Sequence, residues 1–191
     1  WAQGGIAAAM DNSDIDVHIK DTIKNGHDIC NTESVSKIIE QGKKSIDLLI
    51  KHGVNFNSDG TQLHQTLEGG HSKRRIAYHN DNTGEEIHSS LLKKAKESKN
   101  ITIKENVMAI DLIGRKETFC DGLYAYDEIN ECVITIKANI VILATGGASK
   151  IYQYTTNPDT STGDGIALAW RFGCTISNME FMQFHPTCLY H

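Results

Sequence analysis

Glycine-rich turns carry most of the chemical information in this sequence. They lie at residues 2–5, 144–147 and 163–165. A residue without a Cβ lets a ligand approach the backbone, so that amide N–H groups can reach a phosphate or a flat ring. A strand that ends in glycines is also where open α/β sheets bind nucleotides. The three turns together predict a nucleotide-type ligand, although any one of them alone is more often structural.

Three side chains could contact such a ligand or its reaction partner. Asp164 lies at a predicted helix N-terminus, where it would repel a phosphate and accept hydrogen bonds from sugar or ribityl hydroxyls; the alternative is a simple helix cap. His185 lies among aromatic residues before Pro186, as in the wall of a site, and the alternative is a buried structural histidine. Glu68 precedes a Gly-Gly turn and could contact a cation, but an ordinary surface carboxylate is the simpler interpretation.

Composition excludes several classes of function. The 191 residues contain 19 Lys and Arg against 24 Asp and Glu, a net charge of −5, which argues against a nucleic-acid partner. The longest apolar run, residues 140–144, is far shorter than the roughly 20 residues of a membrane span. The five cysteines form no C-x-x-C pair, so we predict neither a disulfide framework nor a metal site, and we expect a cytoplasmic protein.

The spacing of apolar residues predicts four helices that would position these groups. The first covers residues 11–29 and the second residues 33–53 as one continuous helix. A third begins at a capping box formed by Thr83 and Glu86. A short fourth helix contains residues 166–170.

The region between the last two helices is rich in β-forming residues. Residues 140–144 form a continuous apolar run, which is typical of a strand buried on both faces of a parallel sheet. The preceding runs alternate with turn-prone residues and predict an antiparallel meander, at residues 101–104, 107–113, 119–126 and 132–137. The chain is therefore predicted to be α/β.

Several segments, taken together and in this order, resemble the L-aspartate oxidase family of the succinate dehydrogenase and fumarate reductase flavoprotein superfamily. They are W-A-Q-G-G-I (1–6), L-E-G-G-H-S (67–72), A-T-G-G-A-S-K-x-Y (144–152), T-G-D-G (162–165) and M-E-F-M-Q-F-H-P-T (179–187). The likeness implies a Rossmann-like FAD-binding domain with a parallel sheet and an antiparallel β-meander. That domain would take residues 1–187, and residues 188–191 would lead to a capping domain.

The resemblance also implies that the chain is an internal fragment. The family's first strand, with the G-x-G-x-x-G turn that cradles the FAD pyrophosphate, would precede Trp1. The catalytic arginine would follow His191. We therefore expect no catalytic residue within this chain and no activity from the fragment alone.

The resemblance further implies a set of site residues and a reaction. Non-covalent FAD would contact Trp1, Ala2, Gln3, Gly4, Gly5, Ala144, Thr145, Gly146 and Asp164. His185 would hold a substrate carboxylate and Glu68 the amino group. The family oxidises L-aspartate to iminoaspartate with oxygen or fumarate as acceptor, the first step of bacterial de novo NAD synthesis, and a functional coupling to quinolinate synthase is expected.

Glu68 favours the oxidase over the dicarboxylate enzymes, which share the glycine turns. Aspartate differs from succinate by an ammonium group, and the dicarboxylate enzymes are expected to carry an aromatic residue in place of Glu68. A charge-assisted hydrogen bond of about 1.5–3 kcal/mol would give about ten- to a hundredfold preference for the amino acid. Two alternatives stay open: a succinate dehydrogenase or fumarate reductase flavoprotein, and a nucleotide-binding module without catalysis.

Overall fold

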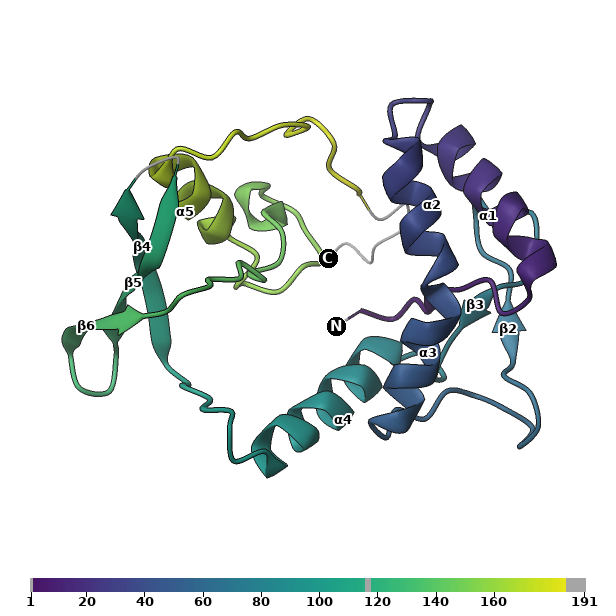
Figure 1. Cartoon of the computed structure of the whole chain (residues 1–191), viewed down its shortest axis with the longest axis horizontal. Coiled ribbons are helices and arrows are strands. Elements are labelled where there is room, and N and C mark those ends of the chain that lie inside the picture. Colours follow the sequence, from purple (N-terminus) through teal and green to yellow (C-terminus); the bar gives the residue numbers. More distant parts are fainter. Residues whose placement is uncertain (1, 116–117, 185–191) are drawn as a thin grey trace. The chain divides into compact units, whose positions relative to one another are not determined.

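The computed structural model describes residues 2–115 and 118–184. The chain divides into two compact units, Trp1–Thr102 and Ile103–His191, and each unit has its own three-stranded sheet (Figure 1). The first unit is mainly helical and the second is mainly β-structure.

Four helices of the first unit are α1 (Asn12–Asn25), α2 (Thr32–Glu40), α3 (Gly42–Lys51) and α4 (Thr83–Glu97). The Asp11 carboxylate accepts the N–H of Ser13 at 2.8 Å and so caps α1, which confirms the helix predicted over residues 11–29. Asn31 caps α2 by accepting the N–H of Ser34 at 2.9 Å.

The single helix predicted over residues 33–53 is wrong, because α2 ends at Glu40 and α3 begins at Gly42. The N–H of Gln41 bonds back three residues to the carbonyl of Ile38 at 3.2 Å, a tight turn that closes α2 before α3 begins. The predicted end of the helical region is confirmed, since Gly53 follows α3 with a φ of +95°.

The helix predicted to begin at Thr83 is confirmed, but the capping box is wrong. Asn82 occupies the N-cap position without a side-chain cap. The Thr83 hydroxyl instead accepts the N–H of His79 at 3.0 Å, and a Glu86 oxygen accepts the N–H of Asn55 at 2.8 Å. Both side chains therefore tie α4 to preceding loops, because tertiary partners compete with the local cap.

The sheet of the first unit is small and antiparallel. It consists of β1 (Ile6–Ala7), β2 (Gln65–Thr66) and β3 (Ile76–Ala77), with β3 in the middle. A core of buried apolar residues joins the sheet to α3 and the loop after it, formed by Ala8, Ile46, Val54, Phe56 and Ala77.

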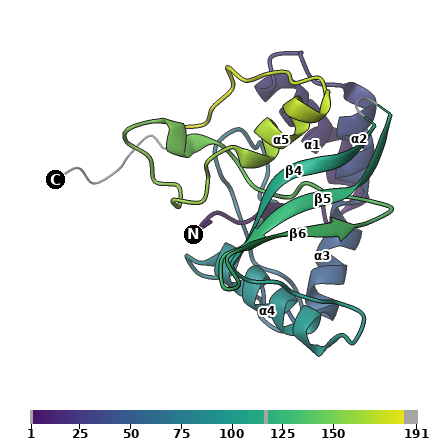
Figure 2. The ribbon, with the colours of Figure 1, turned by 90° about the vertical axis from the view of Figure 1, so that its left-hand side faces the viewer.

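The second unit contains the antiparallel meander β4 (Val107–Arg115), β5 (Phe119–Asp127) and β6 (Cys132–Lys137), and the helix α5 (Asp164–Phe172) beside β4 (Figure 2). Three of the four predicted strands are confirmed, whereas residues 101–104 form no strand. Arg171 of α5 donates from Nη2 to the carbonyl of Ile110 at 2.7 Å, which ties the helix to β4.

The buried parallel strand predicted for residues 140–144 is wrong for the described structure. This segment belongs to no strand, and Ile140 and Ile142 are 79% and 82% exposed. Within residues 2–115 and 118–184 all paired strands are antiparallel. A strand buried on both faces needs neighbouring strands and a covering layer, and the described residues supply neither to this segment.

None of the helices in the described part of the chain combines the length and the apolar character that a transmembrane segment requires.

Candidate functional site

Residues 2–5 lead into β1 and are fixed on two sides. The Ala2 carbonyl accepts the N–H of Gly84 at 2.9 Å, at the start of α4. A Cβ on Gly5 would overlap the carbonyl of Ala77, so Gly5 allows close packing on β3. Gly4, in contrast, has no atom within 4 Å of where its Cβ would lie, so its backbone is open to a ligand. Trp1 lies outside the described residues.

Glu68 lies on an exposed turn, residues 68–72, which follows β2. The register pairs Gln65 with Ala77 and Ala77 with Ile6, so this turn lies at the opposite end of the small sheet from Gly5. The Glu68 carboxylate makes no hydrogen bond or ion pair with any described residue and is free to meet a ligand. Its placement suits a cationic ligand.

A buried ion-pair network lies behind this turn. Arg75 is 0% exposed and binds both oxygens of Asp14 through Nε and Nη2, each at 2.8 Å. Its Nη1 donates to Asp21 at 2.7 Å and to Nδ1 of His71 at 3.0 Å. Because every charged partner is hydrogen-bonded, the network escapes the large cost of an unpaired buried charge.

The network also shifts the titration of its acids. The hydrogen bond from Arg75 lowers the pKa of Asp14, against the opposing effect of burial. The backbone hydrogen bond from Ser72, with side-chain bonds from Arg75 and Ser72, lowers the pKa of Asp21 from 3.8 to about 2. Both carboxylates therefore stay ionised at neutral pH and hold the guanidinium.

His18 completes this region of α1. It is 6% exposed, its ring centroid lies 5.5 Å from that of His71, and its buried Nδ1 has no hydrogen-bond partner among the described residues. Burial lowers the pKa of His18, and the charge of Arg75 lowers it further. A neutral His18 therefore packs beside the network without adding a charge to the three of Arg75, Asp14 and Asp21.

In the second unit, residues 144–147 lie against the N-terminus of α5. The Gly147 carbonyl accepts the N–H of Gly163 at 3.2 Å. A Cβ on Gly165 would overlap the hydroxyl of Thr145, so only glycine lets the two segments approach this closely. Gly146 has a φ of +75° and, like Gly147, has no atom within 4 Å of its Cβ position. This turn therefore leaves open backbone at the start of a helix.

Asp164 is the first residue of α5, after Gly163 at the N-cap. One of its oxygens accepts the Thr162 hydroxyl at 2.8 Å, whereas the other makes no hydrogen bond within the described residues. Asp164 is exposed and is not the N-cap residue, so the alternative of a simple helix cap is wrong. Its carboxylate keeps one oxygen available for a hydroxyl donor.

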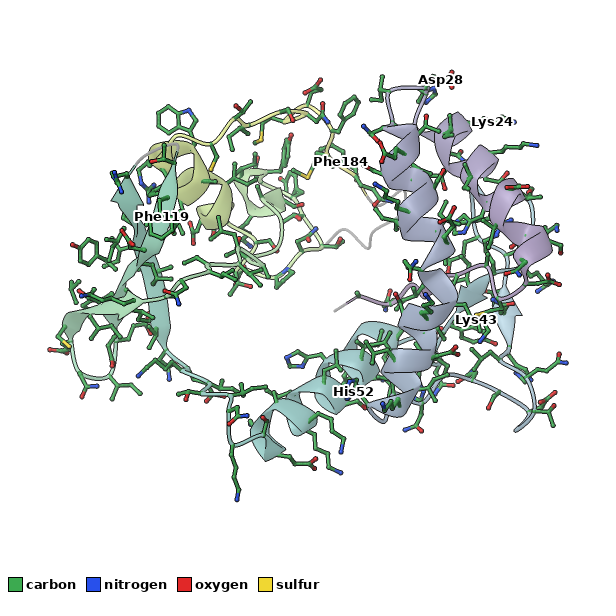
Figure 3. The ribbon with its side chains drawn as sticks, viewed as in Figure 1. Lys24, Asp28, Lys43, His52, Phe119 and Phe184 are labelled. Carbon is green, nitrogen blue, oxygen red and sulfur yellow. The ribbon has the colours of Figure 1, made fainter. Side chains whose placement is uncertain are left out.

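The segment before His185 packs on η1 (Ser149–Ile151), a short 3-10 helix that follows residues 144–147. Ser149 donates from its hydroxyl to the Met182 sulfur at 3.1 Å. The rings of Tyr152 and Phe184 meet edge to face at 5.0 Å, and Figure 3 labels Phe184. His185 itself lies outside the described residues, so its predicted role stays a prediction.

The comparisons with known proteins point to one family. The family model described as "FAD binding domain" matches residues 1–191. The chain belongs to this FAD-binding family. It is 50% identical to an L-aspartate oxidase of Acinetobacter baylyi over 100% of its own length and 37% of that protein, and 48% identical to one of Vibrio cholerae, of which it covers 38%. The chain thus spans less than two-fifths of the length of these relatives.

Solved structures agree with this assignment. Mycobacterium smegmatis Sdh1 in complex with UQ1 superposes with a TM-score of 0.87 and 30% identity, over 97% of this chain and 33% of that one. The E. coli quinol fumarate reductase FrdA with the E245Q mutation gives 0.84 and 26%, over 89% and 29%. The predicted α/β fold and the predicted flavoprotein superfamily are confirmed.

The local structure fits the cofactor of this FAD-binding family. Gly4, Gly146 and Gly147 present backbone that no Cβ or neighbouring atom covers, as a flat ring or a phosphate requires. A metal site has no such support, because residues 2–115 and 118–184 contain no group of three His, Cys, Asp or Glu side chains that could hold an ion.

The ion-pair network around Arg75 was not predicted from the sequence. Arg75 stands in the short basic run Lys73-Arg74-Arg75, which by itself indicates an exposed segment, and the helix over residues 11–29 is predicted from its apolar residues. The signal was the spacing of Asp14, His18, Asp21 and Asn25, which recur every three or four residues and so share one face of a helix. That polar face, rather than an apolar one, carries the buried residues of α1.

Proposed function

We propose that the complete protein is an L-aspartate oxidase, which uses FAD to oxidise L-aspartate to iminoaspartate and passes the electrons to oxygen or fumarate. The placement of Glu68 carries this proposal. Its carboxylate lies exposed on a Gly-Gly turn of an FAD-binding chain that matches L-aspartate oxidases along its whole length. A free carboxylate there would distinguish a substrate with an ammonium group from one without.

In this proposal the glycine turns hold the cofactor. Trp1, Ala2, Gln3, Gly4 and Gly5 would line the flavin, and Ala144, Thr145 and Gly146 would border the cofactor with their open backbone. Asp164 would accept a hydrogen bond from a cofactor hydroxyl through its unoccupied oxygen. Bound FAD would supply the hydride acceptor, and the protein supplies position and charge.

The substrate would be held at both ends. Glu68 would accept hydrogen bonds from the ammonium group, and His185, as an imidazolium, would hold a carboxylate. The catalytic arginine would lie beyond this chain, in the complete protein. We place the reaction in the cytoplasm at the first step of NAD biosynthesis, with quinolinate synthase as the coupled enzyme.

The substitution Glu68→Gln tests the proposal in the full-length enzyme. It keeps the shape of the side chain and removes the charge. We expect kcat/KM for aspartate oxidation to fall about ten- to a hundredfold, since one charge-assisted hydrogen bond is lost. Fumarate reduction by the same variant, measured with a reduced dye as donor, should change little because fumarate has no ammonium group. Equal losses in both assays would remove Glu68 from substrate recognition.

A second assay separates the oxidase from its nearest alternative, a dicarboxylate dehydrogenase or reductase, which the likeness to Sdh1 and FrdA keeps in view. Hydrogen peroxide release is measured with aspartate and with succinate at equal concentration. Release with aspartate alone supports the oxidase. Turnover of succinate alone would replace this proposal with the dehydrogenase.

A further inference from the structure

The 68–72 turn has little internal support. Within it the only backbone hydrogen bond between described residues joins the N–H of His71 to the carbonyl of Glu68 at 3.3 Å. Glu68, Gly69 and Gly70 are exposed, and Gly70 has a φ of +83°. Two adjacent glycines leave a chain many conformations, so contacts from outside the turn must select this one.

The last turns of α1 supply those contacts. Asn25 donates from Nδ2 to the Gly70 carbonyl at 2.6 Å. Asp21 accepts both the N–H and the hydroxyl of Ser72, at 2.9 and 2.8 Å. Because residues four apart share a face of a helix, Asp21 and Asn25 form one polar edge that holds the middle and the end of the turn.

Arg75 connects this edge to His71. The Nη1 that donates to Asp21 also meets His71 Nδ1 at 3.0 Å. A guanidinium has only donors, so Nδ1 must accept, and the proton of the neutral ring lies on Nε2. The orientation of His71 and the position of Ser72 therefore depend on one buried cation, which Asp14 holds from its other side.

We infer that Asp21, Asn25 and Arg75 are positioning residues that hold the 68–72 turn in place and thereby set the preference for an amino acid over a plain dicarboxylate. The inference rests on the proposed function, because it assumes that Glu68 meets the substrate ammonium. A charge-assisted hydrogen bond has strict requirements for distance and angle, so a carboxylate on a loose turn would recognise ammonium poorly. None of the three residues needs to touch the substrate.

The substitution Asn25→Asp in the full-length, FAD-loaded enzyme tests this inference. The side chain keeps its shape, but an oxygen now faces the Gly70 carbonyl and the hydrogen bond is lost. We expect KM for aspartate to rise about three- to tenfold, as for one lost hydrogen bond, with fumarate reduction nearly unchanged. Hydrogen exchange at residues 69–72 should become faster.

Lys24→Gln is the matched control. It changes the charge at the same end of α1 by the same one unit, and the exposed Lys24 side chain, labelled in Figure 3, makes no hydrogen bond or ion pair with the described residues. It should leave KM for aspartate and exchange at residues 69–72 unchanged. Ser72→Ala, which removes one hydrogen bond to Asp21, is a second variant for the case that Asn25→Asp does not fold. It should also raise KM for aspartate and leave fumarate reduction nearly unchanged.

The outcomes separate the two proposals. Selective loss of aspartate oxidation in Glu68→Gln and, more weakly, in Asn25→Asp supports both. A selective effect of Glu68→Gln, with Asn25→Asp and Ser72→Ala behaving like Lys24→Gln, overturns the positioning role and leaves the proposed function intact. No selective effect of Glu68→Gln overturns the proposed function and, with it, the purpose assigned to the turn.

Discussion

The two units hold their glycine turns in different ways. In the first unit, residues 68–72 are held by side chains, through a network in which a fully buried Arg75 binds two carboxylates. In the second unit, residues 144–147 are held by close packing of the Thr145 side chain against Gly165 and by a backbone hydrogen bond between Gly147 and Gly163. Charged side chains therefore hold the turn at residues 68–72. Close packing, which glycines without a side chain permit, holds the turn at residues 144–147.

This difference predicts different vulnerabilities. A network of buried charges fails when one member is removed, because the remaining charges lose their partners but stay desolvated. A turn that depends on close packing tolerates changes of charge and fails when volume is added. Each turn should therefore respond strongly to one kind of substitution and weakly to the other.

Removal of the guanidinium from Arg75 should have the largest effect. Arg75→Met removes the guanidinium that Asp14 and Asp21 share and leaves only Lys73, 3.6 Å from Asp14, as a cation, so it should lower the free energy of unfolding by about 3–5 kcal/mol. Arg171→Met is the control in the second unit, where the pair with Asp111 is 43% and 47% exposed; a loss of about 1 kcal/mol or less is expected. Urea denaturation of the full-length proteins at saturating FAD measures both, and equal losses would contradict the comparison.

The free energy of unfolding should also depend on pH in the acid range, because Asp21 titrates there. Its pKa is lowered from 3.8 in the unfolded chain to about 2 in the fold, so its contribution is complete above pH 3.8 and is lost as the pH falls towards about 2. The contribution is on the order of 2 kcal/mol. Asp21→Asn should therefore be less stable than the parent protein above pH 3.8, and the gap should close below it.

Asp47→Asn controls for the loss of any helical carboxylate. Asp47 pairs with Lys43 on α3, both are 53% exposed, and such a pair contributes under about 0.5 kcal/mol. Unfolding is followed by circular dichroism between pH 2 and pH 7. A gap between Asp21→Asn and the parent that stayed constant down to pH 2 would show that Asp21 does not titrate as the network requires.

Features that depend on neighbouring residues in the sequence could be predicted. Asp11 begins a helix and Gly53 and Gly173 follow the ends of helices, because a cap needs only the adjacent turn. The three strands of the meander follow from alternating β-forming runs with short turns. These interactions are local, so the sequence order is sufficient to find them.

Features that depend on distant residues could not be predicted. The helix break before Gly42 lies where the chain contacts Ala8, and Glu86 bonds to Asn55 instead of capping α4. Arg75 meets Asp14 across 61 positions of the sequence, so a short basic run gave no sign of its burial. The positions of the glycine turns follow from the order of the residues alone, whereas the contacts that hold each turn are visible only in three dimensions.

The smallest effect is expected from adding one methyl group to the second unit, and its sign is informative. Ala is normally about 1 kcal/mol better than Gly within a helix. A Cβ on Gly165, however, would overlap the Thr145 hydroxyl, and it would stay 3.0 Å from the Thr145 Cβ after any rotation of that side chain, so the two segments must shift apart. Because the overlap outweighs the gain in helix propensity, Gly165→Ala should cost a net of about 1 kcal/mol and weaken FAD binding, since residues 144–147 must move.

Two variants give this last experiment its control and its rescue. Gly42→Ala adds the same methyl group at the start of α3, where the nearest atoms lie 3.5 Å away, and should keep or raise stability by up to about 1 kcal/mol. Adding Thr145→Ala to Gly165→Ala should restore part of the loss, since the overlapping atoms are gone. If Gly165→Ala alone stabilised the protein as Gly42→Ala does, close packing would not be what holds the second turn, and the contrast between the two units would fail.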